Sequence, residues 1–234
     1  MNHVLLMMGG SGTRFGAAIP KQFVEVEGQP VFSYVLDKYD RFTKVDSIVL
    51  VCHAEWIDYA DEWAKKLGIA KYVATVEGGA TRSESVLNGL RRLAQYASED
   101  DVVLIHDATH PYLDEGATAD AIAATIDHGA ATLGRKQFDT VYRTDLEGNL
   151  RMVVPREEIV SGASPELFKF GPILRIYENA SPEELEQFTS AGAIALANGI
   201  PMKEVPTDYV NLKITYRHDM ELFERLFHGY YFKN

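Results

Sequence analysis

Cysteine is almost absent from this sequence, whose 234 residues include one, Cys52. A single thiol excludes an intrachain disulfide and favours a reducing, cytoplasmic setting, in which Cys52 is expected to be a small buried residue near a strand end. Long apolar runs are missing as well. The apolar stretch at 3–8 is far shorter than the ~20 residues of a membrane-spanning helix, and no basic segment or small-residue cleavage site flanks it.

Positive charge is also scarce. There are 23 lysine and arginine residues against 34 aspartate and glutamate residues, which gives a formal net charge of −11. An acidic surface repels the phosphate backbone of nucleic acids and anionic lipids, so we expect neither as a partner. A site that binds phosphate groups in such a chain therefore requires its own local cluster of arginine and lysine.

Linkers and repeats are lacking too. No stretch rich in proline, glycine or serine divides the chain, and no low-complexity tract is present. With 46% hydrophobic residues, the sequence has ordinary globular composition. We therefore expect one α/β domain over residues 1–234.

Strand-like and helix-like segments alternate along the first half of the chain. Short apolar runs predict strands at 3–8, 47–52, 71–76 and 101–106, and helical spacing predicts helices at 31–42, 57–67 and 83–96. This alternation favours a Rossmann-like α/β fold with a doubly wound, mostly parallel sheet. Because ligands bind at the carboxyl ends of such strands, the loops after Met8, Val76 and Ile105 are expected to face one crevice.

The second half begins with a different pattern. Alternating segments at 140–144 and 150–154 flank a turn-like stretch and predict a β-hairpin over about residues 138–160. From the residues alone, this hairpin is either an arm that pairs with another subunit or an ordinary edge hairpin of the same domain. The remaining predictions are a helix at 182–198, strands at 201–205 and 211–215, and a helix at 218–228.

A glycine-rich loop, residues 9–16, follows the first predicted strand and is itself followed by Pro20-Lys21-Gln22-Phe23. Glycine lets the backbone approach phosphate oxygens, and Arg14 and Lys21 add the cations that a triphosphate needs. A dinucleotide-binding turn fits poorly, because the glycines at 10, 12 and 16 are spaced too widely and no acidic residue ends the next strand. A Walker loop is excluded because Gly-Lys-Ser/Thr is absent.

A second glycine pair opens the segment 78–90 at a predicted strand-to-helix turn. The free N–H groups of such a turn, together with Arg82 and Ser85, can read the edge of a base. The alternatives are a helix cap for Ser83 and a surface ion pair for Arg82.

Residues 106–111, His-Asp-Ala-Thr-His-Pro, end a predicted buried strand, so the Asp107 carboxylate is expected to point into the crevice. One carboxylate together with phosphate oxygens is the usual way in which proteins hold Mg²⁺. The simpler interpretation of His106 is a packed histidine at the strand end. Lys213, in the segment 211–215, can supply a further cation, although a lysine on an edge strand often serves solubility.

In order along nearly the whole chain, these segments resemble the cytidylyltransferases that make CDP-methylerythritol and CDP-ribitol. The matching motifs are Gly10-Ser11-Gly12-Thr13-Arg14, Pro20-Lys21-Gln22-Phe23, the segment 78–90, the segment 106–111, Asp139-Thr140, Pro155-Arg156, the segment 164–168 and the segment 211–215. Three positions depart from the family pattern: His110 replaces arginine, Glu166 replaces glutamine, and Ser190 stands where aspartate is common.

The resemblance implies a nucleotidyltransferase that transfers CMP from CTP to a small polyol phosphate, releases pyrophosphate and uses Mg²⁺. It implies catalytic roles for Arg14, Lys21 and Lys213 and metal binding by Asp107. The implied CTP-binding residues are Met8, Gly9, Gly10, Gly12, Gly79, Ala80, Arg82, Ser85, Asp107 and Ala108. The implied acceptor-binding residues are Thr140, Arg156 and His110, the first two reaching from the arm of a partner subunit in a homodimer.

Two acceptors, and with them two pathways, stay open. The motif Pro20-Lys21-Gln22-Phe23, Trp56 and the run Val154-Pro155-Arg156 look more like the branch that uses ribitol 5-phosphate, in teichoic acid biosynthesis. The other branch uses 2-C-methyl-D-erythritol 4-phosphate, in isoprenoid biosynthesis. The three departures suggest a non-catalytic nucleotide-binding regulatory protein as an alternative, against which the retained cations and Asp107 argue. A nicotinamide-dependent oxidoreductase is a further alternative and requires tight dinucleotide binding.

Overall fold

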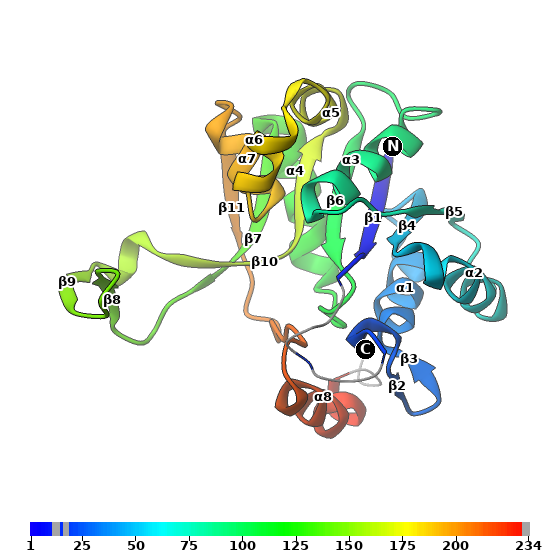
Figure 1. The fold of residues 1–234 in the computed structure, drawn as a ribbon, viewed down its shortest axis with the longest axis horizontal. Helices are drawn as coiled ribbons and strands as arrows, with labels where there is room; N and C mark the ends of the chain where they lie inside the picture. Colours follow the sequence, from blue (N-terminus) through cyan, green and yellow to red (C-terminus); the bar gives the residue numbers. More distant parts are fainter. Residues whose placement is uncertain (11–14, 16–18, 231–234) are drawn as a thin grey trace.

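The computed structural model describes residues 1–10, 15 and 19–230, and its centre is a seven-stranded sheet with the order β11-β7-β10-β6-β1-β4-β5 (Figure 1). The strands are β1 (Asn2–Met8), β4 (Ser47–Cys52), β5 (Tyr72–Glu77), β6 (Val102–Asp107), β7 (Ala130–Lys136), β10 (Val160–Lys169) and β11 (Met202–Pro206). β1 pairs in parallel with β4 and β6, whereas β10 is antiparallel to β6 and β7. The predicted mostly parallel sheet is confirmed.

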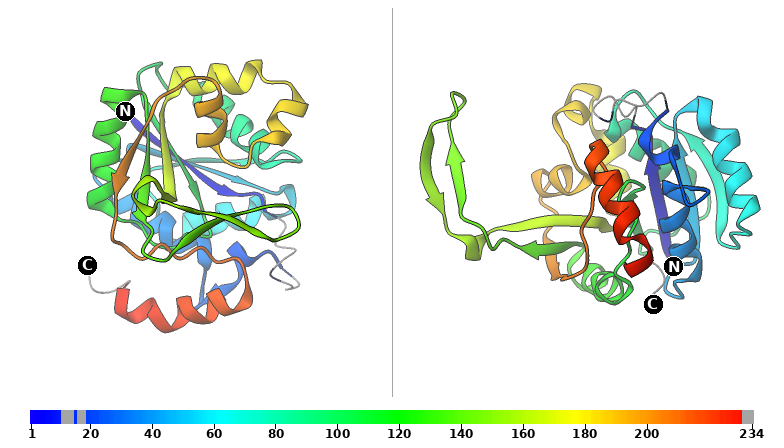
Figure 2. Two further views of the ribbon diagram at one scale, coloured as in Figure 1. Left: turned by 90° about the vertical axis from the view of Figure 1, so that its left-hand side faces the viewer. Right: turned by 90° about the horizontal axis from the view of Figure 1, so that it is seen from below.

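Helices cover both faces of this sheet (Figure 2). On one face, α1 (Val31–Arg41), α2 (Ile57–Lys66) and α4 (Glu115–His128) pack against the central strands. On the other face lie α3 (Arg82–Leu93), α5 (Phe170–Asn179), α6 (Pro182–Gln187) and α7 (Ala191–Ala197). The central strands are apolar at nearly every position because both of their sides are buried.

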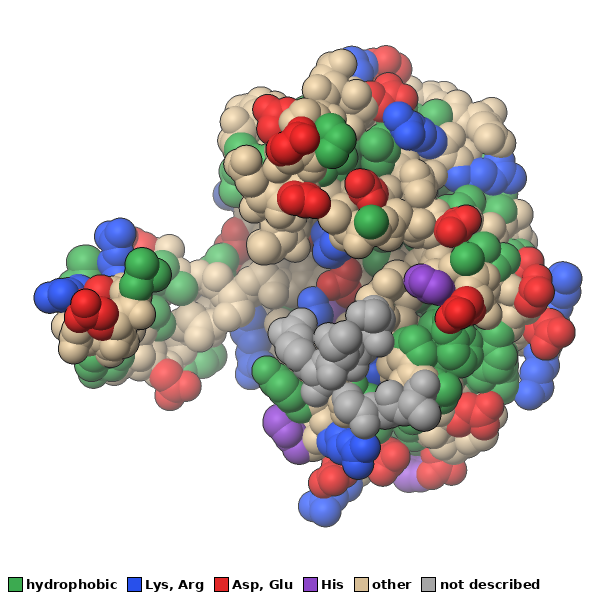
Figure 3. Space-filling view, in the orientation of Figure 1, with side chains coloured by type: hydrophobic (Ala, Val, Ile, Leu, Met, Phe, Trp, Pro, Cys, Tyr) green, Lys and Arg blue, Asp and Glu red, His purple; other side chains and the backbone are tan. Residues whose placement is uncertain are grey.

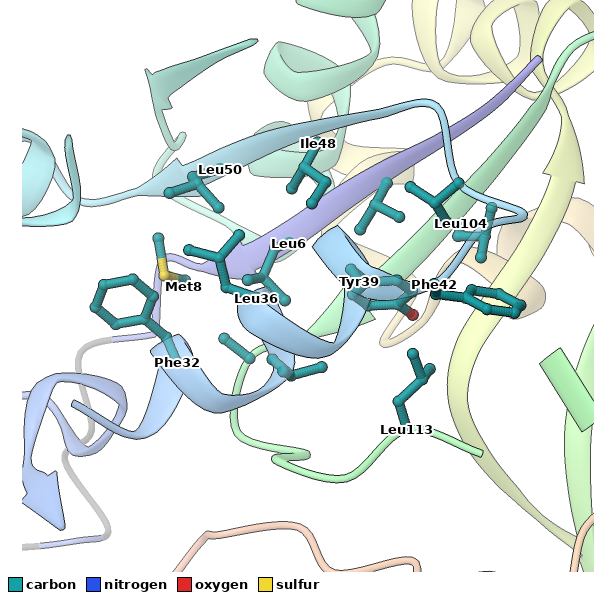
Figure 4. Close-up of a cluster of buried hydrophobic side chains, with 14 of the residues drawn as sticks. Leu6, Met8, Phe32, Leu36, Tyr39, Phe42, Ile48, Leu50, Leu104 and Leu113 are labelled. Carbon is teal, nitrogen blue, oxygen red and sulfur yellow. The ribbon is translucent and has the colours of Figure 1, made fainter. Parts of the chain in front are cut away.

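Figure 4 shows the apolar cluster between α1 and the sheet. Phe32, Leu36 and Tyr39 recur at helical spacing on α1, and all three are fully buried, as are Leu6 and Leu50 of the strands. Burial of a side chain of this size contributes roughly 1.5–3 kcal/mol. The cluster therefore anchors α1 firmly beneath β1.

His106, near the end of β6, is fully buried between two partners. Its Nε2 atom lies 2.9 Å from the His110 carbonyl oxygen, and its Nδ1 atom lies 2.8 Å from the Tyr39 hydroxyl. Because a carbonyl oxygen accepts, Nε2 carries the proton and the Tyr39 hydroxyl donates to Nδ1. Burial lowers the pKa of His106 to about 4, so the ring is neutral. The interpretation as a packed strand-end histidine is confirmed, and this histidine ties the turn after β6 to α1.

A third apolar cluster forms beside β2 (Glu25–Val26) and β3 (Gln29–Pro30). Phe15, from the glycine-rich loop, packs in this cluster with Leu212, Ile214 and the C-terminal helix α8 (Arg217–Tyr230). Leu212 and Ile214 are buried, so the residues on either side of Lys213 are fixed in the core. The cluster thus joins the glycine-rich loop to the segment 211–215, and both segments carry a predicted catalytic cation.

The hairpin extends away from the rest of the structure (Figures 1 and 2). Within the described residues, β8 (Val141–Thr144) and β9 (Leu150–Val154) pair with each other in a separate two-stranded sheet. The Asp145 carboxylate accepts hydrogen bonds from the backbone N–H groups of Glu147 and Asn149 and closes the predicted turn. Exposed apolar side chains on and beside the hairpin are Phe138, Tyr142, Leu146, Leu150, Met152, Val153 and Val160. The hairpin therefore projects from the domain as an arm.

Two predicted elements differ from the structure. The helix predicted at 182–198 is two helices, because the Ser190 hydroxyl accepts from the Ala193 N–H group and starts α7. The segment 211–215 is not a strand of the sheet: its Ile214 N–H group donates to the Thr109 carbonyl oxygen at 2.9 Å. No prediction was made for α4, β7, β10 and α5.

Cys52 is buried at the end of β4, as expected, and burial raises the pKa of its thiol to about 12. Among the helices of the described residues, none is long and apolar enough to cross a membrane.

We expect the substitution Tyr39→Phe to lower the free energy of unfolding by about 1–3 kcal/mol, because it leaves a buried His106 nitrogen without its donor. Urea unfolding followed by circular dichroism measures the change. The matched control is Tyr59→Phe, whose hydroxyl bonds Glu25 at the surface and whose loss should cost less than about 0.5 kcal/mol. Equal stability of the Tyr39 variant and the parent protein would show that this bond does not hold the turn.

Candidate nucleotide-binding site

A cavity of about 660 Å³ lies at the carboxyl ends of β1, β5 and β6. The predicted site residues that line it are Met8, Gly9, Gly10, Lys21, Gly79, Ala80, Arg82, Ser85, Asp107 and Lys213. In Figure 3, basic and acidic side chains lie together in the hollow near the middle of the view. The three loops that were expected to share one crevice do share it.

Asp107 is the electrostatic centre of this cavity. One of its oxygens accepts hydrogen bonds from Arg82 Nη2 at 3.0 Å and Nε at 3.3 Å, and the other accepts from Lys213 Nζ at 2.8 Å. Burial alone would raise the pKa of the carboxyl, but the charges of Arg82 and Lys213 hold it well below its usual range. Asp107 is therefore ionised at any physiological pH.

Arg82 stands between two carboxylates. Its Nη2 atom also lies 3.9 Å from Glu166 Oε2. Burial lowers the pKa of the guanidinium, but the charges of Asp107 and Glu166 raise it by more. The pKa is therefore raised overall, and the group keeps its charge. The alternative of a surface ion pair is wrong, because Arg82 and both partner carboxylates are partly shielded from water and Asp107 lines the cavity.

Gln22 connects the two parts of the first motif. Its side-chain amide donates to the carbonyl oxygens of Met8 at 2.6 Å and Gly10 at 2.9 Å. These bonds tie the short helix Lys21–Phe23 to the end of β1, so that Lys21 reaches the same cavity as the glycine backbone. The motif spacing predicted Lys21 at this place, but the tethering role of Gln22 was not predicted.

The turn between β5 and α3 is held by its own side chains. Thr81 and Glu84 form a capping box, and the Glu84 carboxylate also accepts from the Ala80 N–H group at 2.7 Å. Ser85 Oγ accepts from the Gly79 N–H group at 3.0 Å. A Cβ atom at Gly79 would lie 2.2 Å from the Glu84 Cβ, which explains the glycine.

Two expectations about this turn were therefore wrong. The N–H groups of Gly79 and Ala80 are not free, because Ser85 and Glu84 already accept from them. Ser83 is not the helix cap: Thr81 fills that position, and the Ser83 hydroxyl donates to the Phe188 carbonyl oxygen at 3.4 Å.

Other predicted residues lie outside this cavity lining. Ala108 and His110 are buried behind it, and burial, followed by the charges of His106 and Lys213, lowers the pKa of His110 to about 3. A neutral imidazole in that position lacks the permanent charge of the arginine that the family pattern has. Thr140 and Arg156 are exposed on the arm, where Arg156 donates to the Phe138 carbonyl oxygen. Gly12 and Arg14 lie outside the described residues.

Several lining residues were not predicted, among them Thr109 and the pair His53-Ala54. His53 and Ala54 follow β4, whose carboxyl end lies at the same sheet edge as that of β1. The position of a loop after a parallel strand is the sequence signal that would have identified them.

Asp107 is a carboxylate that a divalent cation could use in this cavity. Among the described residues, no group of three or more histidine, cysteine, aspartate or glutamate side chains could hold a metal ion by itself. Asp107 is ionised, and its Oδ2 atom keeps a lone pair beyond the one used by Lys213, whereas Oδ1 accepts twice from Arg82. This donor set fits Mg²⁺ held jointly by one carboxylate and the phosphate oxygens of a ligand.

Comparison with known proteins agrees with this geometry. Residues 2–228 match the family model described as IspD, 2-C-methyl-D-erythritol 4-phosphate cytidylyltransferase. The chain is 32% identical over 226 residues to the enzyme of that name from Clostridium novyi, with 96% of each chain covered. It is also 28% identical over 222 residues to ribitol-5-phosphate cytidylyltransferase from Lacticaseibacillus paracasei, with 94% of this chain and 95% of that protein covered.

The fold is shared with solved structures. The crystal structure of the 4-diphosphocytidyl-2C-methyl-D-erythritol synthase from Anaerococcus prevotii superimposes with a TM-score of 0.81 at 24% sequence identity, covering 97% of this chain and 96% of that one. Since the family model spans nearly the whole sequence and relatives match it over almost their full lengths, the chain belongs to the IspD family of cytidylyltransferases, which are nucleotidyltransferase enzymes.

Proposed function

We propose that this protein is a cytoplasmic, CTP-dependent cytidylyltransferase that transfers CMP to a polyol phosphate, preferably ribitol 5-phosphate, and releases pyrophosphate. The observation that carries the proposal is the gathering of Lys21, Arg82 and Lys213 around one cavity in a chain with a net charge of −11. Against an acidic background, such a local cluster is suited to a polyphosphate.

The chemistry follows from the charges involved. An oxygen of the acceptor phosphate attacks the α-phosphorus of CTP, a new P–O bond forms, and the bond to the pyrophosphate oxygen breaks with its electron pair. The nucleophile is already an anion, so no strong general base is needed, and catalysis consists of positioning and charge stabilisation. Lys21 and Lys213, with Arg14, are proposed to neutralise charge around the α-phosphate.

The remaining residues have binding roles in this proposal. Ser85 and the backbone of residues 8–10 and 79–80 would surround the nucleotide, together with Gly12 and Ala108. Asp107, with oxygens of the triphosphate, would hold Mg²⁺, which neutralises phosphate charge when bound. The Asp107 carboxylate already pairs with one cation in the structure, the ammonium group of Lys213.

The acceptor phosphate is proposed to be gripped by Thr140 and Arg156 from the arm of a second copy, with His110 nearby. Exposed apolar side chains on a projecting hairpin support a role in pairing with another subunit. Phe23 and Trp56, two residues that favour the ribitol branch, stack on each other at 4.3 Å between ring centroids. This stacking gives both rings a packing role, and neither belongs to the described residues that line the cavity.

Pyrophosphate release with CTP and Mg²⁺, measured separately with ribitol 5-phosphate and 2-C-methyl-D-erythritol 4-phosphate, tests the reaction and the acceptor together. We expect release with ribitol 5-phosphate. Release with methylerythritol phosphate alone would assign the protein to the other branch. Binding of CTP without release from either acceptor would favour a non-catalytic nucleotide-binding role.

Substitution of Lys21 by alanine should lower turnover by about two to three orders of magnitude, because a cation at the reacting phosphate is lost. The melting temperature should change little. Lys65→Ala, which removes an exposed lysine of α2, is the matched control and should keep full activity. Near-normal turnover in the Lys21 variant would contradict its assignment.

Mixing two inactive variants tests whether the arm acts on a neighbouring subunit. Lys21→Ala and Arg156→Ala should each be nearly inactive alone. If Arg156 serves the partner's site, each mixed dimer contains one intact site, and an equimolar mixture should recover about a quarter of parental activity. No recovery after verified subunit exchange would show that Arg156 acts within its own chain or has no such role.

A further inference from the structure

Glu166 is one of the three departures from the family pattern, and it lies directly behind Arg82. Alternation along β10 places it on the same side of the sheet as Phe168, which packs with α3 and α7. Glu166 is outside the set of described residues that line the cavity, whereas Arg82 belongs to that set. Glu166 is therefore placed to act on a ligand in the cavity through Arg82.

The guanidinium of Arg82 lies near two carboxylates. Its Nη2 atom lies 3.0 Å from Asp107 Oδ1 and 3.9 Å from Glu166 Oε2. Arg82 and both carboxylates are partly shielded from water, with side-chain exposures of 31% for Arg82 and 19% for each carboxylate. Such shielding makes the attraction less screened than at an open surface.

Glu166 is itself held in one position by backbone donors. Its Oε2 and Oε1 atoms accept hydrogen bonds from the N–H groups of Ala191 at 3.1 Å and Gly192 at 2.9 Å. A Cβ atom at residue 192 would lie 2.6 Å from Glu166 Oε1, so the close approach requires glycine there. These bonds hold the Glu166 carboxylate in place near Arg82.

Tyr177, on α5, belongs to the same apolar cluster as Phe168. It is fully buried, and its hydroxyl has no hydrogen-bond partner within the described part of the chain. Burial raises the pKa of Tyr177, the charge of Arg82 lowers it, and that of Glu166 raises it.

From this arrangement we propose that Glu166 is a positioning residue for the nucleotide: it holds Arg82 at the cavity wall in the orientation that receives CTP. The inference rests on the proposed CTP site. Ser190, a second departure, belongs to the same helix end, because its hydroxyl accepts from the Ala193 N–H group. Both departures thus bond the start of α7, but the carboxylate near Arg82 is that of Glu166.

The test uses Glu166→Gln, which keeps the shape and one oxygen acceptor of the side chain but removes its charge. We expect the Kd for CTP, measured by titration calorimetry, and the KM to rise about fivefold, in proportion to the loss of one partly exposed ion pair. The kcat for pyrophosphate release should change less than about twofold, since Glu166 does not touch the reacting atoms. In an Arg82→Gln background, the same substitution should add nothing.

Ser190→Ala is the matched control, because it weakens the same helix end through a different bond. It should lower the melting temperature and leave the Kd for CTP unchanged. If Glu166→Gln does not fold, Glu166→Asp is the second variant. Its side chain is one methylene shorter, so its carboxylate lies farther from Arg82 and CTP binding should weaken in the same way.

Three outcomes would overturn the proposal: an equal effect of Ser190→Ala on CTP binding, an equal effect of Glu166→Gln with and without Arg82, or no effect of Glu166→Gln. Failure of the parent protein to bind CTP at all would refute the proposed function as well, so the two failures are distinguishable.

Discussion

The site depends on the two ion pairs that the Asp107 carboxylate forms with Arg82 and Lys213. The carboxylate joins three segments that are remote in sequence: the end of β6, the first turn of α3 and the segment before α8. Removing one partner would leave a partly buried charge without compensation, which is more costly than the pair is favourable. The carboxylate thus organises both the nucleotide side and the segment that carries Lys213.

Apolar packing brings these charges together. The third cluster contains Phe15 from the glycine-rich loop as well as Leu212 and Ile214 beside Lys213. The Tyr39–His106 bond holds the turn that begins with Asp107. Each charged group is therefore placed by a neutral, buried contact one or two residues away, and such preorganisation is what charge stabilisation requires.

Much of this could be predicted from sequence, for identifiable reasons. β1, β4 and β6 are short, continuously apolar runs, so they were found within about a residue, as was β5. Helix α4 was missed because it is rich in alanine and its apolar face is indistinct. The split between α6 and α7 depends on one hydroxyl at Ser190, which has no periodic signal. The occupied N–H groups of the α3 turn arise from contacts between side chains and backbone that spacing does not encode.

The separate sheet of the hairpin has a consequence for how such a protein can diverge. Because β8 and β9 are not paired with the seven-stranded sheet in the described part of the chain, substitutions at their tips alter neither the core nor the nucleotide cavity. The arm can accumulate changes at little cost in folding, while the strands beneath the cavity cannot. If the arm contacts the acceptor as proposed, a new acceptor can be accommodated by changing a few exposed residues on a fixed nucleotide-binding body. Relatives named for two different polyol phosphates, similar to this chain over almost all of its length, are what such modular evolution would leave behind.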